Sequence, residues 1–167
     1  MNNLEFSQQT KKEAQEILDS SDVANLLSKF GDVRIGGSFY TDLMYGPDID
    51  VTVVTKTPRD SAIKFLNEVI TNKLFQKYQY GDFENFPRKN RPKDHIVVLI
   101  LPYKDRKWEI EIWFRNISNK EQIELENKLK NLPAETKLQI INKKSDRGIY
   151  VLSKHNLSSF EIYQEYV

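Results

Sequence analysis

The sequence predicts an α+β fold in which helices flank a mixed β-sheet and short helices close the chain. Segments with apolar residues at helical spacing stand at both ends, and β-branched or aromatic segments with period two lie between them. Of the 167 residues, 39% are hydrophobic and 29% are charged, a balance typical of a globular chain with one core. We therefore expect a single domain over residues 1–167, with its core at about 31–115.

The expected elements of the first half follow in chain order. Residues 7–30 are predicted to form helices, because apolar residues such as Ala14, Ile17 and Leu18 recur at helical spacing. A short strand at 33–35 runs into a Gly-Gly-Ser turn, and residues 49–54 form a β-branched strand. Pro58 opens the next helix. Its apolar face is expected to contain Ile63, Leu66, Val69, Ile70 and Leu74.

In the second half, residues 78–94 are polar and basic, and we expect no regular element there. Strands at 96–101 and 107–114 are predicted to form a hairpin around the turn at 102–106. Helices are expected at about 119–132, at 135–143 and from 159 to near the end. The C-terminal helices thus occupy 119–167.

Composition excludes several kinds of site. The 25 basic and 24 acidic side chains nearly cancel, so a polyanionic partner must be held by a local patch. The absence of cysteine excludes disulfides, thiolate metal sites and a cysteine nucleophile, and two histidines make a histidine-built metal site unfavourable. The N-terminal segment lacks a signal-peptide pattern, and the longest apolar run, 96–101, is too short to span a bilayer. We expect a cytoplasmic protein without a membrane partner.

Two pairs of acidic residues stand on predicted strands. Asp48 and Asp50 share one strand face because successive side chains alternate, and Glu109 and Glu111 form a similar pair in KWEIEIWF. Like charges this close repel each other unless a cation lies between them. If the two strands are neighbours, their oxygen ligands favour Mg²⁺, an ion whose coordination is often completed by substrate phosphates.

The Gly36-Gly37-Ser38 turn supplies the features of a phosphate site. Glycines allow the backbone to approach a phosphate closely, exposed N–H groups can bind it, and the Ser38 hydroxyl adds a donor. A phosphate site beside an acidic strand face indicates metal-assisted phosphoryl or nucleotidyl transfer.

These residues resemble the signature of the DNA polymerase beta-type nucleotidyltransferase superfamily: Gly37-Ser38, nine further residues, then Asp48-Ile49-Asp50 on a strand. The stretch 108–112, WEIEI, is most similar to a small bacterial single-domain branch, in which the third acid lies three positions after the tryptophan. That position is Glu111. The resemblance covers residues 33–115, and the ending SSFEIYQEYV is also similar to that branch. Two departures are a Glu where Asp is commoner, and a loop, FYTDLMYGP, without the arginine that follows Gly-Ser in many minimal members.

The resemblance implies a sheet of the nucleotidyltransferase type and a Mg²⁺-dependent transferase. Such an enzyme moves a nucleoside monophosphate from a nucleoside triphosphate, ATP for example, to an acceptor hydroxyl. The catalytic residues would be Asp48, Asp50 and Glu111, which would also be the ligands of two Mg²⁺ ions, with Mn²⁺ as a substitute. Glu111 would act as general base. The nucleotide-binding residues would be Gly36, Gly37 and Ser38. The acceptor stays open between a small molecule, an RNA end and a protein hydroxyl.

Other interpretations remain. The chain could be a non-catalytic nucleotide-binding or antitoxin-like regulatory module on the same fold, or a structural domain whose acids are only solvated. Glu109 is interpreted as a solvent-facing neighbour and His95 as structural. The basic residues Arg88, Lys89, Arg91 and Lys93 could contact a triphosphate or an anionic acceptor, but a solvated loop is the favoured interpretation. Phe39, Tyr40 and Tyr45 could stack on a base, with core packing favoured.

Overall fold

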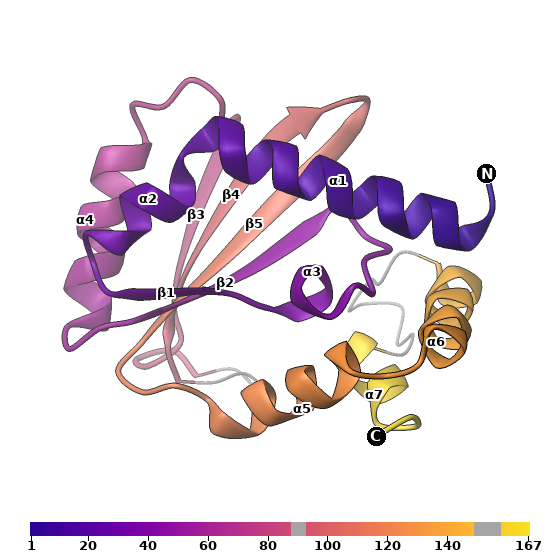
Figure 1. The fold of residues 1–167 in the computed structure, drawn as a ribbon. Coiled ribbons are helices and arrows are strands. Elements are labelled where there is room, and N and C mark those ends of the chain that lie inside the picture. Colours follow the sequence, from indigo (N-terminus) through magenta and orange to yellow (C-terminus); the bar gives the residue numbers. More distant parts are fainter. Residues whose placement is uncertain (88–92, 149–157) are drawn as a thin grey trace.

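A five-stranded mixed sheet forms the centre of the computed structural model, which describes residues 1–87, 93–148 and 158–167 (Figure 1). The strands are β1 (Asp32–Ile35), β2 (Asp48–Val54), β3 (Lys77–Asp82), β4 (His95–Tyr103) and β5 (Arg106–Arg115), in the order β1-β2-β5-β4-β3. β2 and β5 run parallel, and the other neighbouring pairs are antiparallel. The expected α+β fold with a mixed sheet is confirmed.

Helices precede, interrupt and follow the strands. They are α1 (Asn3–Ser21), α2 (Val23–Ser28), α3 (Gly37–Thr41), α4 (Pro58–Val69), α5 (Lys120–Lys130), α6 (Ala134–Arg147) and α7 (Ser159–Tyr163). The first helix begins earlier than residue 7, because Asn2 and Glu5 form a reciprocal capping box at its start. Among the described residues, no helix combines the length and apolar character needed to cross a membrane.

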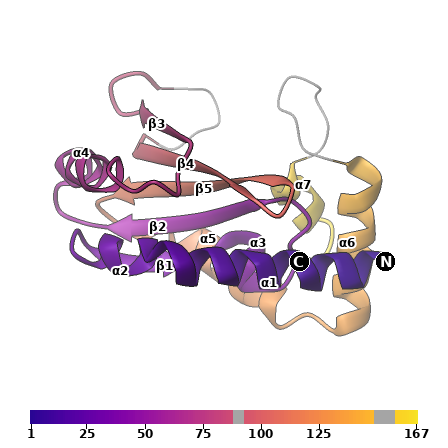
Figure 2. The same cartoon turned by 90° about the horizontal axis from the view of Figure 1, so that it is seen from above.

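One face of the sheet carries the main core. Along β2, Ile49, Val51 and Val53 are at most 1% exposed, while the residues between them are exposed or half-buried. Apolar residues of α1, α2 and α4 pack in the same cluster, including Ile17, Leu27 and Phe65. Figure 2 shows α1 and α2 along one side of the molecule and β3 and β4 along the other. Because successive residues of a strand point to opposite faces, the polar side chains of β2 lie on the face away from this core.

A second, smaller core joins the C-terminal helices to the segment before β2. Leu43 packs with Leu129 of α5, Ile140 and Ile141 of α6, and Ile162 of α7. Figure 1 shows α5, α6 and α7 gathered on one side of the sheet. The predicted C-terminal helices are confirmed, and their packing brings the end of the chain to the polar face of β2.

The predicted apolar face of α4 is wrong in part. Ile63, Ile70 and Leu74 are 40%, 57% and 46% exposed, and the last two lie beyond the helix, which ends at Val69. Of the predicted face, Val69 is buried and Leu66 packs against the main core, and the other buried positions are Ser61, Ala62 and Phe65. The predicted and the observed faces both have helical spacing, but only the observed face includes Phe65, whose ring packs 5.9 Å from the Phe114 ring of the sheet.

A strand also forms where none was expected. β3 pairs antiparallel with β4 at the edge of the sheet, from Lys77 opposite Ile100 to Asp82 opposite His95. The sequence does not predict this strand because its residues are mostly polar. An edge strand is stabilised by backbone hydrogen bonds on one side and needs little apolar surface. The predicted hairpin is confirmed, with Lys104 and Asp105 at φ 45° and 59°, the left-handed pair that suits a two-residue turn.

Candidate active site

The register between β2 and β5 places four carboxylates on one face of the sheet. Asp48 lies opposite Glu109, and Asp50 lies opposite Glu111, on adjacent parallel strands. The alternate residues of β5, Ile110 and Ile112, are fully buried on the other face. The two acidic pairs are therefore neighbours, as expected if their strands were adjacent.

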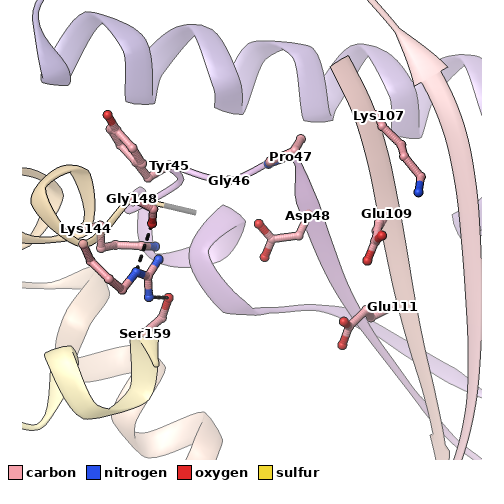
Figure 3. A pocket seen from close by; sticks show the side chains of 11 residues that line it. Tyr45, Gly46, Pro47, Asp48, Lys107, Glu109, Glu111, Lys144, Gly148 and Ser159 are labelled. Atoms are coloured by element: carbon pink, nitrogen blue, oxygen red, sulfur yellow. Dashed lines mark hydrogen bonds between the residues drawn. The ribbon is translucent and has the colours of Figure 1, made fainter. Parts of the chain in front are cut away.

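Two cavities open on this carboxylate face. One, of about 390 Å³, is lined by Gly37, Ser38, Asp48, Asp50 and Glu111 together with residues of α5 and α7. The other, of about 410 Å³, also contains Asp48 and Glu111 and adds Glu109, Lys107, Lys144 and Arg147. Figure 3 shows the carboxylates of Asp48, Glu109 and Glu111 pointing into this second cavity, with Lys144 on the opposite wall. Because Asp48 and Glu111 line both cavities, they lie between a glycine-rich wall and a cationic wall.

The Gly-Gly-Ser segment is the start of α3 rather than an open turn. Gly36 N–H donates to the main-chain oxygen of Asp50 over 2.9 Å, which fixes the segment beside β2. Gly37 has φ +60°, and a Cβ there would lie 2.0 Å from Asp50 Oδ2. Only glycine fits this position, because the conformation is left-handed and the space belongs to the aspartate. The segment and the Asp48–Asp50 pair thus form one unit.

A further carboxylate, which sequence reasoning missed, reaches this segment from α5. Glu126 is buried, and its Oε1 accepts hydrogen bonds from Gly37 N–H at 2.9 Å and from Gln122 Nε2 at 3.0 Å. Its Oε2 forms an ion pair with Arg34 of β1. Neither residue carries a local signal, since a glutamate in a charged helix and an arginine in a short strand both suggest solvent contact.

Lys144 of α6 is a second functional candidate that the sequence did not indicate. It is 2% exposed, and its Nζ donates to Leu43 O at 2.6 Å and to the Tyr163 hydroxyl at 3.2 Å. Burial lowers the pKa of Lys144 to about 8, although the nearby charges of Asp48 and Asp50 oppose this shift. At neutral pH this lysine is a buried cation facing the carboxylate face.

The carboxylates perturb one another strongly. Burial, and then the charges of Asp48, Glu111 and Glu126, raise the pKa of Asp50 to about 8. Ionised Asp50 is therefore costly without a further positive charge, as argued from the sequence for two aspartates on one strand face.

The oxygen donors on this face suit a hard divalent cation in kind and in location. As the side chains lie, however, no three His, Cys, Asp or Glu residues in the described chain are arranged to hold a metal ion. The assignment of Asp48, Asp50 and Glu111 as metal ligands stays a prediction that requires side-chain movement.

Several other candidates lie away from the carboxylates or are used in packing. His95 is buried, with its ring nitrogens bonded to the Tyr80 hydroxyl at 2.9 Å and Glu84 Oε2 at 3.0 Å, a structural setting. Phe39 and Tyr45 pack against the two cores, although Tyr45 also lines the larger cavity. Tyr40 lies beneath the Arg34 guanidinium at 5.0 Å. Of the basic stretch, Arg88, Lys89 and Arg91 lie outside the described residues.

No protein-family model and no curated protein matches the chain. Solved structures do match it. A Cid1 poly(U) polymerase with Mg and 3'-dATP bound has a TM-score of 0.67 at 20% identity, over 93% of this chain and 48% of that one. The non-canonical poly(A) polymerase complex GLD-2–GLD-3 has a TM-score of 0.67 at 12% identity, over 98% and 57%. A cytoplasmic RNA terminal U-transferase has a TM-score of 0.60 at 19% identity, over 95% and 50%.

The chain thus spans about half the length of the solved structures that it matches. At these identities the likeness shows the fold alone, and the matches extend over 93–98% of this chain. The α+β fold predicted from the sequence is therefore the fold that this chain shares with these polymerases and this terminal transferase.

Proposed function

We propose that this chain is a Mg²⁺-dependent nucleotidyltransferase that moves a nucleoside monophosphate from a nucleoside triphosphate to an acceptor hydroxyl. The observation that carries the proposal is the register of Asp50 with Glu111, because Asp48, Asp50 and Glu111 line one cavity together with Gly37 and Ser38. The tryptophan at position 108, three residues before Glu111, supports a place in the small bacterial single-domain branch.

Each part of the site has a task in this reaction. Gly37 and Ser38 bind the triphosphate from one side, and the cationic wall formed by Lys144 and Arg147 offsets its charge from the other. Gly36 lines neither cavity, and its N–H is bonded to the main-chain oxygen of Asp50. Asp48, Asp50 and Glu111 would hold Mg²⁺, or Mn²⁺ in its place. A bound divalent ion supplies Lewis-acid stabilisation of phosphate charge and lowers the pKa of the attacking hydroxyl.

The bond changes follow from this arrangement. Glu111 accepts the proton of the acceptor hydroxyl, whose oxygen forms a bond to the α-phosphorus. The bond between the α-phosphorus and the bridging oxygen breaks, and pyrophosphate leaves toward the cationic wall. Glu109 belongs to the same strand face, but it lines only the larger cavity and lies opposite Asp48 rather than Asp50.

An RNA end is the first acceptor to test, because the solved neighbours include a poly(U) polymerase, a poly(A) polymerase and an RNA terminal U-transferase. A small molecule or a protein hydroxyl remains an alternative acceptor. The second candidate function is a non-catalytic nucleotide-binding module, possible on the same fold. The loop FYTDLMYGP after Ser38 favours it, since it lacks the arginine that follows Gly-Ser in many minimal members of the superfamily that the sequence resembles.

The test incubates the protein with each α-labelled nucleoside triphosphate and Mg²⁺, in the presence of an RNA oligonucleotide, a protein fraction or a small-molecule fraction. Label transfer and pyrophosphate release that disappear in Asp50→Asn support the enzyme. Mg²⁺-dependent binding of a triphosphate without turnover on any acceptor supports the binding module. Absence of binding would leave only a structural role.

A further inference from the structure

The strongest unassigned feature of the molecule is the contact of Glu126 with the Gly-Gly-Ser segment. Its carboxylate accepts the Gly37 N–H, and a Cβ added at Gly36 would lie 3.1 Å from both of its oxygens. The Glu126 side chain therefore lies directly against both glycines. It lines the 390 Å³ cavity together with Asp48, Asp50 and Glu111, so four carboxylates surround the space proposed for a triphosphate.

Glu126 and a phosphate compete for the same donor. The Gly37 N–H already makes its hydrogen bond to Glu126 Oε1, and one amide hydrogen makes one strong bond. A phosphate oxygen brought to that amide would also meet a buried like charge at close range, which is repulsive in a partly desolvated site. The cavity thus accepts a triphosphate here only if the Glu126 carboxylate moves away.

Arg34 lies where it can bind the phosphate once the Glu126 carboxylate has moved. It pairs with Thr52 across β1 and β2, two positions along β2 from Asp50, so its side chain lies on the carboxylate face. The guanidinium is held over the Tyr40 ring and paired with Glu126, and its side chain is 29% exposed. Arg34 is also the basic residue nearest in sequence to Gly37, and the loop FYTDLMYGP that follows Ser38 has none.

We propose that Arg34 is a phosphate-binding residue of the nucleotide site and that Glu126 occupies its guanidinium, and the Gly37 amide, until a triphosphate arrives. Binding exchanges the Arg34–Glu126 ion pair for an Arg34–phosphate pair, which a planar guanidinium makes in bidentate form. The exchange lowers the apparent affinity for the triphosphate, because part of the binding free energy is used to release Glu126. This inference rests on the proposed function for its ligand, a triphosphate.

The experiment measures binding of inorganic tripolyphosphate and of ATP to the full chain by isothermal titration calorimetry, with Mg²⁺. Glu126→Gln keeps the size of the side chain and removes its charge, and it is expected to tighten tripolyphosphate binding about tenfold. The matched control is Glu124→Gln, which makes the same change at an exposed position of α5 and should leave the affinity unchanged. Arg34→Met should weaken binding about tenfold, and Glu126→Gln should give a smaller gain in the Arg34→Met background.

Unchanged or weaker binding by folded Glu126→Gln would overturn the proposal. If this variant does not fold, Arg34→Lys decides, because it keeps the charge but loses the bidentate geometry: weaker binding supports the proposal, and unchanged affinity overturns it. Tripolyphosphate binding that tightens in Glu126→Gln without any nucleotide transfer would reject the proposed catalysis and retain the exchange. Nucleotide transfer by Arg34 variants at the rate of the parent would retain the proposed catalysis and reject the exchange.

Discussion

Asp50 of β2 and Glu111 of β5 lie side by side on adjacent parallel strands, although they are sixty-one positions apart in the sequence. Asp48 and Glu109 form the equivalent pair two residues earlier on each strand. Each aspartate thus has its own glutamate partner, so the register by itself does not choose between Glu109 and Glu111. What distinguishes the glutamates is the cavity beside them: Glu111 also lines the one that contains Gly37 and Ser38, and Glu109 does not.

Glu111→Gln is expected to lower turnover by roughly a hundredfold or more, the scale of losing a general base, while triphosphate binding largely remains. Glu109→Gln should cost only a few-fold, because Glu109 is separated from Asp50 by one step of roughly 6.5–7 Å along the strand. Steady-state assays of nucleotide transfer compare the two variants. A larger loss in Glu109→Gln would assign the third carboxylate to Glu109.

Asp50→Asn should abolish turnover and stabilise the metal-free protein. The folded state raises the pKa of Asp50 to about 8, well above the unfolded value near 4. For such a group the stability is fully present below about pH 4 and is lost as the pH rises toward about 8, by at most ~1.4 kcal/mol per pH unit. Urea unfolding without metal should show the parent losing stability from pH 5 to 8 relative to Asp50→Asn. A lower stability of this variant at pH 8 would mean that Asp50 is structural.

Asp48→Asn should likewise abolish turnover, but with a smaller gain in stability, because Asp48 is exposed. Its charge still raises the pKa of Asp50, so its removal relieves part of that repulsion. Mg²⁺ should increase the melting temperature of the parent more than that of either aspartate variant. An equal increase in all three proteins would place the ion elsewhere.

Gly37→Val should abolish triphosphate binding and lower the melting temperature. Its φ is +60°, which disfavours a β-branched residue, and its Cβ would lie 2.0 Å from Asp50 Oδ2. Ser38→Ala should be milder and weaken binding by one charge-assisted hydrogen bond, roughly 1.5–3 kcal/mol. Calorimetric titration with ATP measures both effects. Affinities equal to that of the parent in both variants would move the phosphate away from α3.

Lys144→Met should weaken tripolyphosphate binding about tenfold at pH 7, as expected for loss of one charge-assisted contact. Lys143→Met, on the same helix but paired with Glu165 at the surface, is the matched control. The pKa of Lys144 is about 8, so its charge is present below that pH and is lost above it. Metal-free binding by the parent should therefore weaken from pH 7 to 9, more steeply than binding by Lys144→Met. Parallel pH profiles would exclude Lys144 from the site.

The sequence by itself determined the features that depend on neighbouring residues. Alternation along a strand is a property of the backbone, so Asp48 and Asp50 had to share a face once Ile49 and Val51 were buried. The Gly37-Ser38 spacing and the turn between β4 and β5 are local in the same sense. Where two local patterns fit equally well, as on α4, the sequence could not choose, and packing of Phe65 against the sheet decided.

Only the tertiary structure decided which distant residues complete the site. Glu126 meets Gly37 across 89 residues of sequence, and Lys144 meets Leu43 across 101. Both glutamate and lysine on polar helices are ordinarily solvated, and their burial here results from the packing of α5 and α6 beside the carboxylate face. Long-range contacts of this kind depend on how whole elements pack, a property that no window of neighbouring residues contains. The partners of Asp50 across the sheet, and the charges that set its pKa, were fixed at that level.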